Sequence, residues 1–265
     1  MIPQRIQYLL GSCERVQLLN AISRGVATQS KLAADCEVAR STVHRNLDGL
    51  LERGWVTTTE DGYRLTAAGE SILVAYREFA ESVRTVGEHE PFLQQLEPVD
   101  SRPPASALAG CETTVATEAN PHAPSVEVAA MIRRNAGEWM RIAVIGVSPI
   151  TNQATREAVE AGSDLELLFD TTVLKTLQRD YDAAVSEALE QDGVTMRISQ
   201  GKIVTGLVVT DDEICVVVQD DCGNAVACLT GTTPEIRTWA ERIYERLHER
   251  TRLLSAETGG VPTVG

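Results

Sequence analysis

The sequence is poor in lysine and in long apolar runs. Lys31, Lys175 and Lys202 are the only lysines, against 21 arginines in 265 residues. No apolar run approaches the roughly 20 residues that a membrane-spanning helix needs. The first residues, MIPQRIQYLLGSCERV, contain neither a long apolar stretch nor a signal cleavage site. We therefore expect a cytoplasmic protein that has no signal peptide and no membrane partner.

The patterns that hold metals and nucleotides are missing as well. None of the six cysteines forms a CxxC pair, and no histidine is interleaved with them, so zinc-site spacing is absent. The P-loop, Gly-x-Gly-x-x-Gly and Gly-x-Ser-x-Gly patterns are absent too. We expect no catalytic residues, no metal and no cofactor, and therefore no enzyme.

The cysteines have two readings. In a cytoplasmic chain they are reduced and mostly buried thiols. Cys215, Cys222 and Cys228, however, lie on or between neighbouring predicted strands, which leaves a redox or soft-metal sensor as the alternative. The other cysteines are Cys13, Cys36 and Cys111.

Acidic side chains are unevenly distributed along the chain, whose net charge is −14. Residues 1–90 hold 10 Lys and Arg against 12 Asp and Glu, whereas residues 91–265 hold 14 against 26. The first part is therefore nearly neutral, and the second carries most of the acid. This acid-rich, lysine-poor composition resembles that of proteins from salt-accumulating halophiles; an ordinary acidic protein is the alternative.

One stretch, TQSKLAADCEVARSTVHRNLDGLLERGWVTTTEDGYRL, organises the N-terminal part. Apolar residues at helical spacing predict a short helix over 29–35 and a second helix over 40–53. Two short strands, 55–59 and 63–65, are expected on either side of a polar turn. The apolar residues that face inward are Leu32, Ala33, Val43, Leu47, Leu50 and Leu51. The order is helix, turn, helix and a two-stranded wing.

This stretch resembles the winged helix-turn-helix of archaeal transcription regulators. The resemblance rests on Arg40-Ser41-Thr42-Val43, Leu50, Glu52-Arg53-Gly54-Trp55-Val56, Tyr63-Arg64-Leu65-Thr66 and Gly69. The other face of the second helix holds Arg40, Ser41, Thr42, His44, Arg45 and Asn46, and such groups can contact bases and phosphates in a major groove. The resemblance implies double-stranded DNA as a partner. The residues expected to contact it are Gln29, Ser30, Lys31, Arg40, Ser41, Thr42, His44, Arg45 and Arg64.

The start of the second helix departs from that family. Related regulators place Ser or Asp before the Arg-Ser-Thr run, whereas Ala39 has no side-chain oxygen to accept from the free amides. The missing cap costs about 0.5–2 kcal/mol. Thr28, in contrast, is expected to cap the first helix.

A long helix is predicted over residues 66–89. Its apolar residues recur at steps of 4, 3, 4 and 3, which is a short a/d seam of about two heptads. They are Ile72, Tyr76, Phe79, Val83 and Val86. The seam either packs on its own domain or joins two subunits. We expect a homodimer, because winged-helix regulators bind two half-sites as symmetric pairs.

The remaining chain divides by composition. We predict a DNA-binding domain with its long helix over 1–90, a proline-rich linker over 91–124 with one short strand at 111–117, and a flexible tail over 255–265. Between the linker and the tail, residues 125–254 begin with alternating strands and helices and continue with strands joined by hairpin turns. This order predicts an α+β chain whose second domain is an α/β domain with a mixed sheet.

The second domain also carries a resemblance. The order RIAVIGVSP, helix, DLELLFDTTVLKTL, helix, VTMRI, GLVVTDDEICVVVQDDCGNAVACL and TWAERIYERL resembles the sensor domain of sugar-responsive and methanogenesis-type archaeal regulators. That domain is related in fold to phospholipase D, but the His-x-Lys pair of the enzymes is absent here. The resemblance implies a transcription regulator whose second domain senses a small metabolite and alters operator affinity. The alternative is the redox or metal-responsive regulator that uses Cys215, Cys222 and Cys228.

Ligands of open α/β sheets bind beyond the carboxyl ends of the strands. We therefore expect the small molecule to contact Ser148, Asp170, Thr171, Thr172, Ser199 and Lys202.

Overall fold

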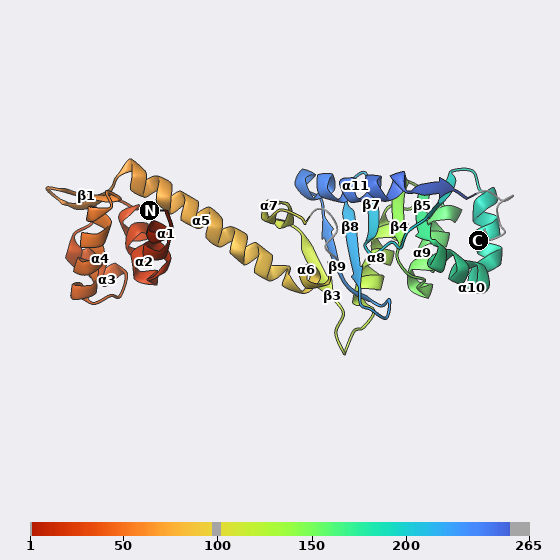
Figure 1. The fold of residues 1–265 in the computed structure, drawn as a ribbon, viewed down its shortest axis with the longest axis horizontal. Helices are drawn as coiled ribbons and strands as arrows, with labels where there is room; N and C mark the ends of the chain where they lie inside the picture. The colour runs from red at the N-terminus through yellow and green to blue at the C-terminus, as the bar shows by residue number, and fades with distance from the viewer. Residues whose placement is uncertain (1, 97–101, 255–265) are drawn as a thin grey trace. The chain divides into compact units, whose positions relative to one another are not determined.

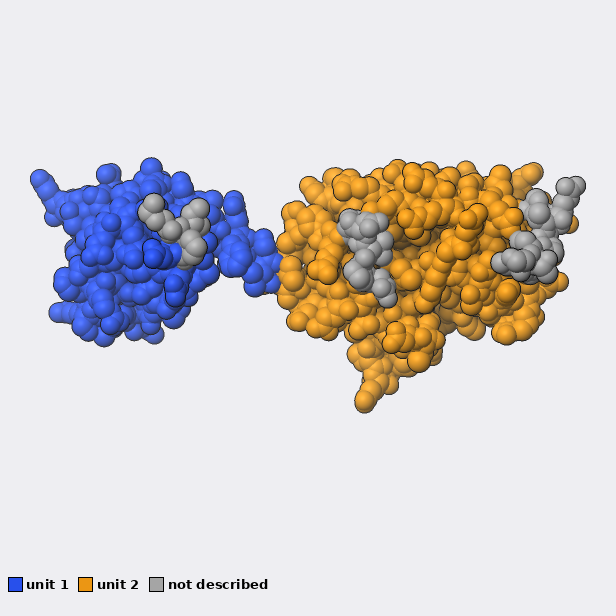
Figure 2. Space-filling model, in the orientation of Figure 1, with its two compact units in different colours: residues 1–83 blue, residues 84–265 orange. Residues whose placement is uncertain are grey.

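The computed structural model describes residues 2–96 and 102–254. The chain forms two compact units, Met1–Val83 and Arg84–Gly265, shown in different colours in Figure 2. The expected tail over 255–265 and residues 97–101 of the expected linker lie outside the described residues. No helix in the part of the chain that the structure describes is both long and apolar enough to cross a membrane.

The first unit contains the predicted helix, turn, helix and wing (Figure 1). Its elements are α1 (Ile2–Leu10), α2 (Cys13–Ile22), α3 (Gln29–Asp35), α4 (Arg40–Glu52), β1 (Val56–Thr59), β2 (Gly62–Leu65) and the start of α5 (Ala67–Glu88). The wing turns at Gly62, whose φ is +140°, and a Cβ there would lie 2.6 Å from the carbonyl oxygen of Ala27. Only glycine allows that approach, which lets Ala27 pair with Tyr63 beside the wing.

The core of the first unit lies beneath α4. Leu32, Val43, Leu47 and Leu50 are fully buried, as the helical spacing predicted. The sequence interpretation of Asn46 was wrong. We placed this residue on the exposed face of the helix, but it is only 3% exposed. Its Oδ1 accepts a hydrogen bond from Arg15 Nε at 3.3 Å, so a partner on α2 holds it inside.

The two helices of the helix-turn-helix begin differently. The Thr28 hydroxyl accepts from the backbone N–H of Lys31 at 3.3 Å and caps α3. Ala39 stands at the same position before α4 and supplies no side-chain cap. Both results agree with the sequence analysis, and α4 therefore starts with amide groups that its own cap does not satisfy.

The second unit is built on an eight-stranded mixed sheet in the order β10-β6-β5-β4-β7-β8-β9-β3. Strands β4, β5 and β6 are parallel neighbours, and the other pairs are antiparallel. The predicted fold class is confirmed. The elements are α6 (Glu90–Gln95), α7 (Ala105–Leu108), β3 (Glu112–Val115), α8 (Ala123–Arg134), β4 (Trp139–Val144), α9 (Pro149–Glu160), β5 (Asp164–Asp170), α10 (Thr171–Glu190), β6 (Val194–Ser199), β7 (Gly206–Thr210), β8 (Ile214–Gln219), β9 (Ala225–Gly231), α11 (Pro234–Glu249) and β10 (Thr251–Leu253).

Helices cover both faces of this sheet (Figure 1). Apolar residues of α8, α9 and α10 pack on one face, and those of α6, α7 and α11 pack on the other. Along β4 and β5 the side chains alternate between the two faces, so Ile142 and Leu167 join one core and Ala143 and Leu168 join the other. The central strands are therefore buried on both sides, which explains their near-continuous apolar sequences.

The ends of this domain can be compared with the sequence expectations. The short strand expected at 111–117 is present as β3, which pairs with β9, and the stretch that we interpreted as a linker also buries Phe92, Ala107 and Leu108 against the core. Pro91, Pro104 and Pro124 stand at helix starts, where no backbone N–H donor is required. The sequence predicts a closing helix over 234–254, whereas α11 ends at Glu249 and Thr251–Leu253 forms an edge strand beside β6.

Candidate functional site

The first candidate site is the exposed face of α4. Packing of Val43, Leu47 and Leu50 against the core turns the opposite side of the helix to solvent, where Arg40, Ser41, His44 and Arg45 are exposed and Thr42 is half-buried. Gln29 Nε2 donates to the carbonyl of Arg40 at 3.3 Å and joins α3 to the start of α4. His44 pairs with Asp48 at 3.5 Å. Most of the predicted DNA-contacting side chains thus lie on or beside one helix face.

Arginines of the first unit divide by whether they have partners. Arg15 donates to the carbonyl of Tyr8 and to Asn46. Arg53 donates to the carbonyl of Gly49 at 2.8 Å, and its guanidinium lies 3.5 Å from the centre of the Tyr8 ring. The guanidinium groups of Arg40 and Arg45 form no hydrogen bond or ion pair with any other residue that the structure describes. Their guanidinium groups are therefore free to bind an anion.

Lys31, Ser30 and Arg64 complete the predicted contact residues. Lys31 and Ser30 are exposed in the first turn of α3, and Arg64 is exposed on the second strand of the wing. The wing turn itself carries Glu60 and Asp61, both exposed. These carboxylates repel phosphate, so the favourable charge lies on α4 and on the strand of the wing, away from its tip.

Five of the six residues predicted to bind the small molecule lie together at the carboxyl ends of β5 and β6, where Asp170 and Ser199 are register partners. Asp170 is buried and accepts backbone N–H groups from Thr172 at 2.8 Å, Val173 at 2.9 Å and Ile203 at 3.2 Å. Ser199 is buried and accepts from the N–H of Gly201 at 3.2 Å, and Thr171, Thr172 and Lys202 are exposed. The carboxyl ends of β5 and β6 are thus closed by the protein's own hydrogen bonds.

A pocket of about 130 Å³ opens instead at the carboxyl end of β4. Of the predicted ligand contacts, only Ser148 lines it. Its floor comes from β4, β7 and β8, and its walls come from α8 and α9. The residues with polar side chains along it are Ser125, Ser148, Thr151, Asn152, Thr155 and Gln219. The strand-end rule identified this edge of the sheet, but the sequence analysis missed every polar contact except Ser148.

Two buried polar atoms of the pocket stand out. Asn152 Nδ2 and Gln219 Oε1 are shielded from solvent, and neither has a hydrogen-bond partner within the described residues. Leaving such a group unpaired costs roughly 1–3 kcal/mol. Asn152 lies in the first turn of α9 and Gln219 ends β8, so sequence spacing gave no sign that they meet.

A second hollow of about 130 Å³ lies on the other side of α9 and is mostly apolar. Leu177, Val185 and Tyr181 of α10 line it, and the helix is kinked at Tyr181, where φ is −141° and ψ is 28°. Asn152 and Thr155 line both hollows, so α9 separates them.

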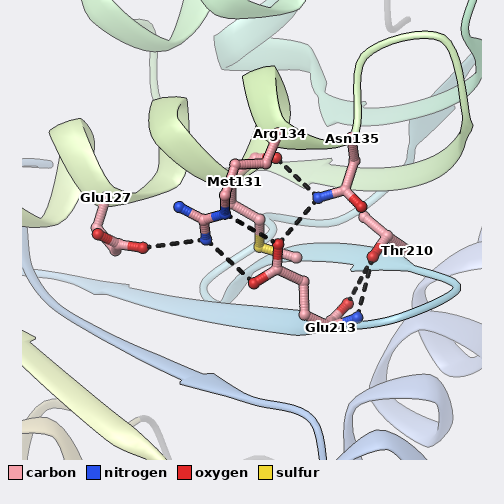
Figure 3. Close-up of polar contacts among 6 residues, drawn as sticks. All are labelled: Glu127, Met131, Arg134, Asn135, Thr210 and Glu213. Carbon is pink, nitrogen blue, oxygen red and sulfur yellow. Dashed lines mark hydrogen bonds and ion pairs between the residues drawn. The ribbon is translucent and has the colours of Figure 1, made fainter.

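The opposite end of β4 is closed by an ion-pair network, drawn in Figure 3. The Glu213 carboxylate accepts from Arg134 at 3.1 Å and from Asn135 Nδ2 at 2.9 Å, and Arg134 also pairs with Glu127 at 3.3 Å. The hydrogen bond with Glu213 raises the pKa of Arg134. This network joins α8 to the turn between β7 and β8.

The three cysteines of the alternative hypothesis do not form a cluster. Cys215 and Cys228 are buried on β8 and β9, whereas Cys222 is exposed in the turn between these strands. A hydrogen bond with Cys228 and burial raise the pKa of Cys215 well above its ordinary value, which keeps its thiol protonated. Across the described ranges, no group of three His, Cys, Asp or Glu side chains is placed to hold a metal ion.

Comparisons with known proteins match the two parts of the chain separately. Residues 3–88 match the family described as the HVO_A0261 N-terminal domain, and residues 121–250 match the middle domain of the methanogenesis regulatory protein FilR1. A comparison with curated protein sequences gives no match.

Solved structures also match the chain, at low sequence identity. TrmBL2, an archaeal chromatin protein described as showing a novel mode of DNA binding, is 14% identical; the match covers 95% of this chain and 100% of that one, with a TM-score of 0.43. Nuc from Salmonella typhimurium, a phospholipase D family member, is 14% identical over 55% of this chain and 99% of its own, with a TM-score of 0.40. NucT from Helicobacter pylori is 10% identical over 54% and 98%, with a TM-score of 0.41.

Proposed function

We propose that the chain is a transcription regulator that binds operator DNA through α4 and a small metabolite through its second domain. The matches of residues 3–88 to the HVO_A0261 N-terminal domain family and of residues 121–250 to the FilR1 middle domain family support this proposal. Metabolite binding changes the affinity for the operator. In measured cases such coupling is about 5–150-fold.

One observation carries the DNA-binding proposal. Arg40 and Arg45 lie on the exposed face of α4 and are free of partners among the residues described, whereas Arg15 and Arg53 are held by protein groups. Arginine binds guanine edges and phosphates through two parallel hydrogen bonds. The start of α4 adds backbone amides that Ala39 leaves uncapped, and a DNA phosphate can accept from them.

Arg45→Ala tests this assignment. Preferred DNA sites are first selected from a random pool with the wild-type chain, and gel-shift titration then compares wild type and variant on the selected site. We expect a loss of about 1–3 kcal/mol, roughly 5- to 150-fold in affinity, because one bidentate base contact is removed. Equal binding by both proteins would show that Arg45 does not contact DNA.

Arg77→Ala is the matched control. Arg77 is also an exposed arginine of the first unit, but its guanidinium is bonded to Asn20 Oδ1 at 2.6 Å. The Arg77→Ala variant loses the same charge as Arg45→Ala, but from a side chain that lies outside α4 and is already bonded within the protein. We therefore expect it to leave the affinity for the selected site nearly unchanged. If Arg77→Ala weakens binding as much as Arg45→Ala does, net charge and not α4 controls the interaction.

We propose that the chain acts as a homodimer through the outer part of α5. The predicted seam divides into two parts: Ile72 and Tyr76 pack against the core of their own domain, whereas Phe79, Val83 and Val86 are 55%, 55% and 42% exposed. These three residues lie at steps of 4 and 3 along one helix and form an apolar stripe that suits a second copy of the same stripe.

Phe79→Glu should convert the dimer to a monomer, because two copies of the variant would bury like charges opposite each other. Sedimentation equilibrium at several concentrations measures the change. Val74→Glu is the control, since Val74 is 50% exposed on the same helix but outside the seam. A monomeric wild type, or a dimer that survives Phe79→Glu, contradicts the proposal.

A further inference from the structure

The pocket at the carboxyl end of β4 is lined without a single charged side chain. Its apolar lining comes from valine, isoleucine, leucine and alanine, and its polar lining comes from hydroxyl and amide groups. The nearest carboxylate along the chain, Asp220, is engaged by the N–H groups of Cys222 and Asn224, both at 2.9 Å. A buried anion would therefore meet no cation among the lining side chains.

The hydrogen-bonding capacity of the lining can be assigned group by group. The hydroxyls of Thr151 and Thr155 donate to the carbonyls of Ser148 at 3.2 Å and Thr151 at 3.0 Å, so toward the pocket they only accept. Asn152 Nδ2 is a donor and Gln219 Oε1 an acceptor, and both lack a partner in the described parts of the chain. The residues that line the pocket thus carry at least one unused donor and one unused acceptor, and both belong to neutral amides.

We propose that this pocket selects a small uncharged molecule that accepts a hydrogen bond from Asn152 Nδ2 and donates one to Gln219 Oε1. The proposal rests on the proposed metabolite-sensing function and narrows it to neutral compounds that carry a hydroxyl or primary amide group, excluding phosphorylated and carboxylate metabolites. Burying an ion without a partner costs far more than burying a hydroxyl or amide that is fully hydrogen-bonded. The volume of about 130 Å³ is close to that of cavities that hold a benzene-sized molecule, so the enclosed part of the ligand has about six non-hydrogen atoms.

Paired probes that differ in charge test the selectivity. Glycerol is compared with glycerol 3-phosphate, and propanamide with propanoate, by calorimetric titration and thermal unfolding of the full chain without DNA. We expect the neutral member of at least one pair to bind and to raise the unfolding temperature, because it binds only the folded state. The charged member of that pair should bind at least tenfold more weakly.

The double variant Asn152→Leu, Gln219→Met tests the two atoms directly. Both replacements keep approximate shape and remove the unpaired polar groups, so the ligand-free variant should unfold at the same or a higher temperature than wild type. Its response to the neutral probe should fall at least tenfold. Thr205→Val is the matched control, because Thr205 Oγ1 is also buried without a partner in the described chain but does not line the pocket, and this variant should keep the full response.

Several results would overturn the proposal. Both neutral probes failing to bind, a charged probe binding as well as its neutral partner, or a double variant with wild-type affinity would each do so. A ligand-free double variant that unfolds at a clearly lower temperature would show that the two amides are structural. Since no DNA is present, these failures are distinguishable from a failure of operator binding, which the gel-shift titration measures without any ligand.

Discussion

The carboxyl ends of β4 and β5 lie side by side in the sheet, yet they differ in whether their polar groups are hydrogen-bonded. At the end of β5, Asp170 begins α10 and accepts three backbone N–H groups. At the end of β4, Ser148 begins α9 without a side-chain cap, and two buried amide atoms beyond it have no partner in the described residues. The polar groups at one strand end are satisfied by the protein, whereas those at the other include two atoms that are left unpaired.

Asp170→Ala should have the largest effect on this comparison. It leaves two amides at the start of α10 and the N–H of Ile203 without their acceptor in a buried position. We expect a loss of about 2–4 kcal/mol in the free energy of unfolding, measured by urea denaturation. Thr171→Ala, at the exposed neighbouring position, should change it by less than about 0.5 kcal/mol. A similarly small effect of Asp170→Ala would mean that the β5 end is not held by this carboxylate.

Glu213→Ala should have an intermediate effect at the amino end of β4. It removes the acceptor shared by Arg134 and Asn135, but Arg134 is 49% exposed and can be solvated, so the expected loss is about 1–2 kcal/mol. Asp212→Ala, next to it in the same turn and exposed, serves as the control. Chemical denaturation of both variants in low and high salt measures the difference, which screening should reduce only in part. Equal stabilities of the two variants would contradict a bracing role for the network.

Ser148→Asp should have the smallest effect on stability and would make the β4 end more like the β5 end. An aspartate at this position can accept from the free amides of α9, as Asp170 does for α10, for a gain of about 0.5–1 kcal/mol. It also places a charge in the neutral pocket, so the neutral probe should bind more weakly. Ser148→Ala, which loses no side-chain cap, should leave stability nearly unchanged. Unfolding curves with and without glycerol separate the two effects.

The first unit could be predicted from sequence because its signals are local. Helical spacing placed Leu32, Val43 and Leu47 in the core, and Thr28 as a cap. Asn46 was misplaced because a polar residue at a buried helix position needs a partner from another helix, here Arg15, and the spacing within one helix does not reveal it.

The pocket illustrates the same limit on a larger scale. The rule for parallel sheets identified the edge that carries it, and Ser148 followed from that rule. The rule cannot distinguish neighbouring strand ends, because that depends on which polar groups find protein partners. Gln219 reaches the pocket from an antiparallel strand, and its meeting with Asn152 is a result of tertiary packing.

The uncharged lining of the pocket has a consequence for how the protein responds to its ionic surroundings. Binding of a neutral molecule to neutral groups involves no counterion release and is not screened, so its affinity stays nearly constant as salt concentration changes. The free arginines of α4 are in the opposite situation. Each contact that they make with a DNA phosphate weakens as the salt concentration rises, because salt ions compete for the charged groups. Under the proposed function, a change in ionic strength therefore alters how much of the protein is on DNA, whereas the ligand affinity of the DNA-free protein stays nearly constant.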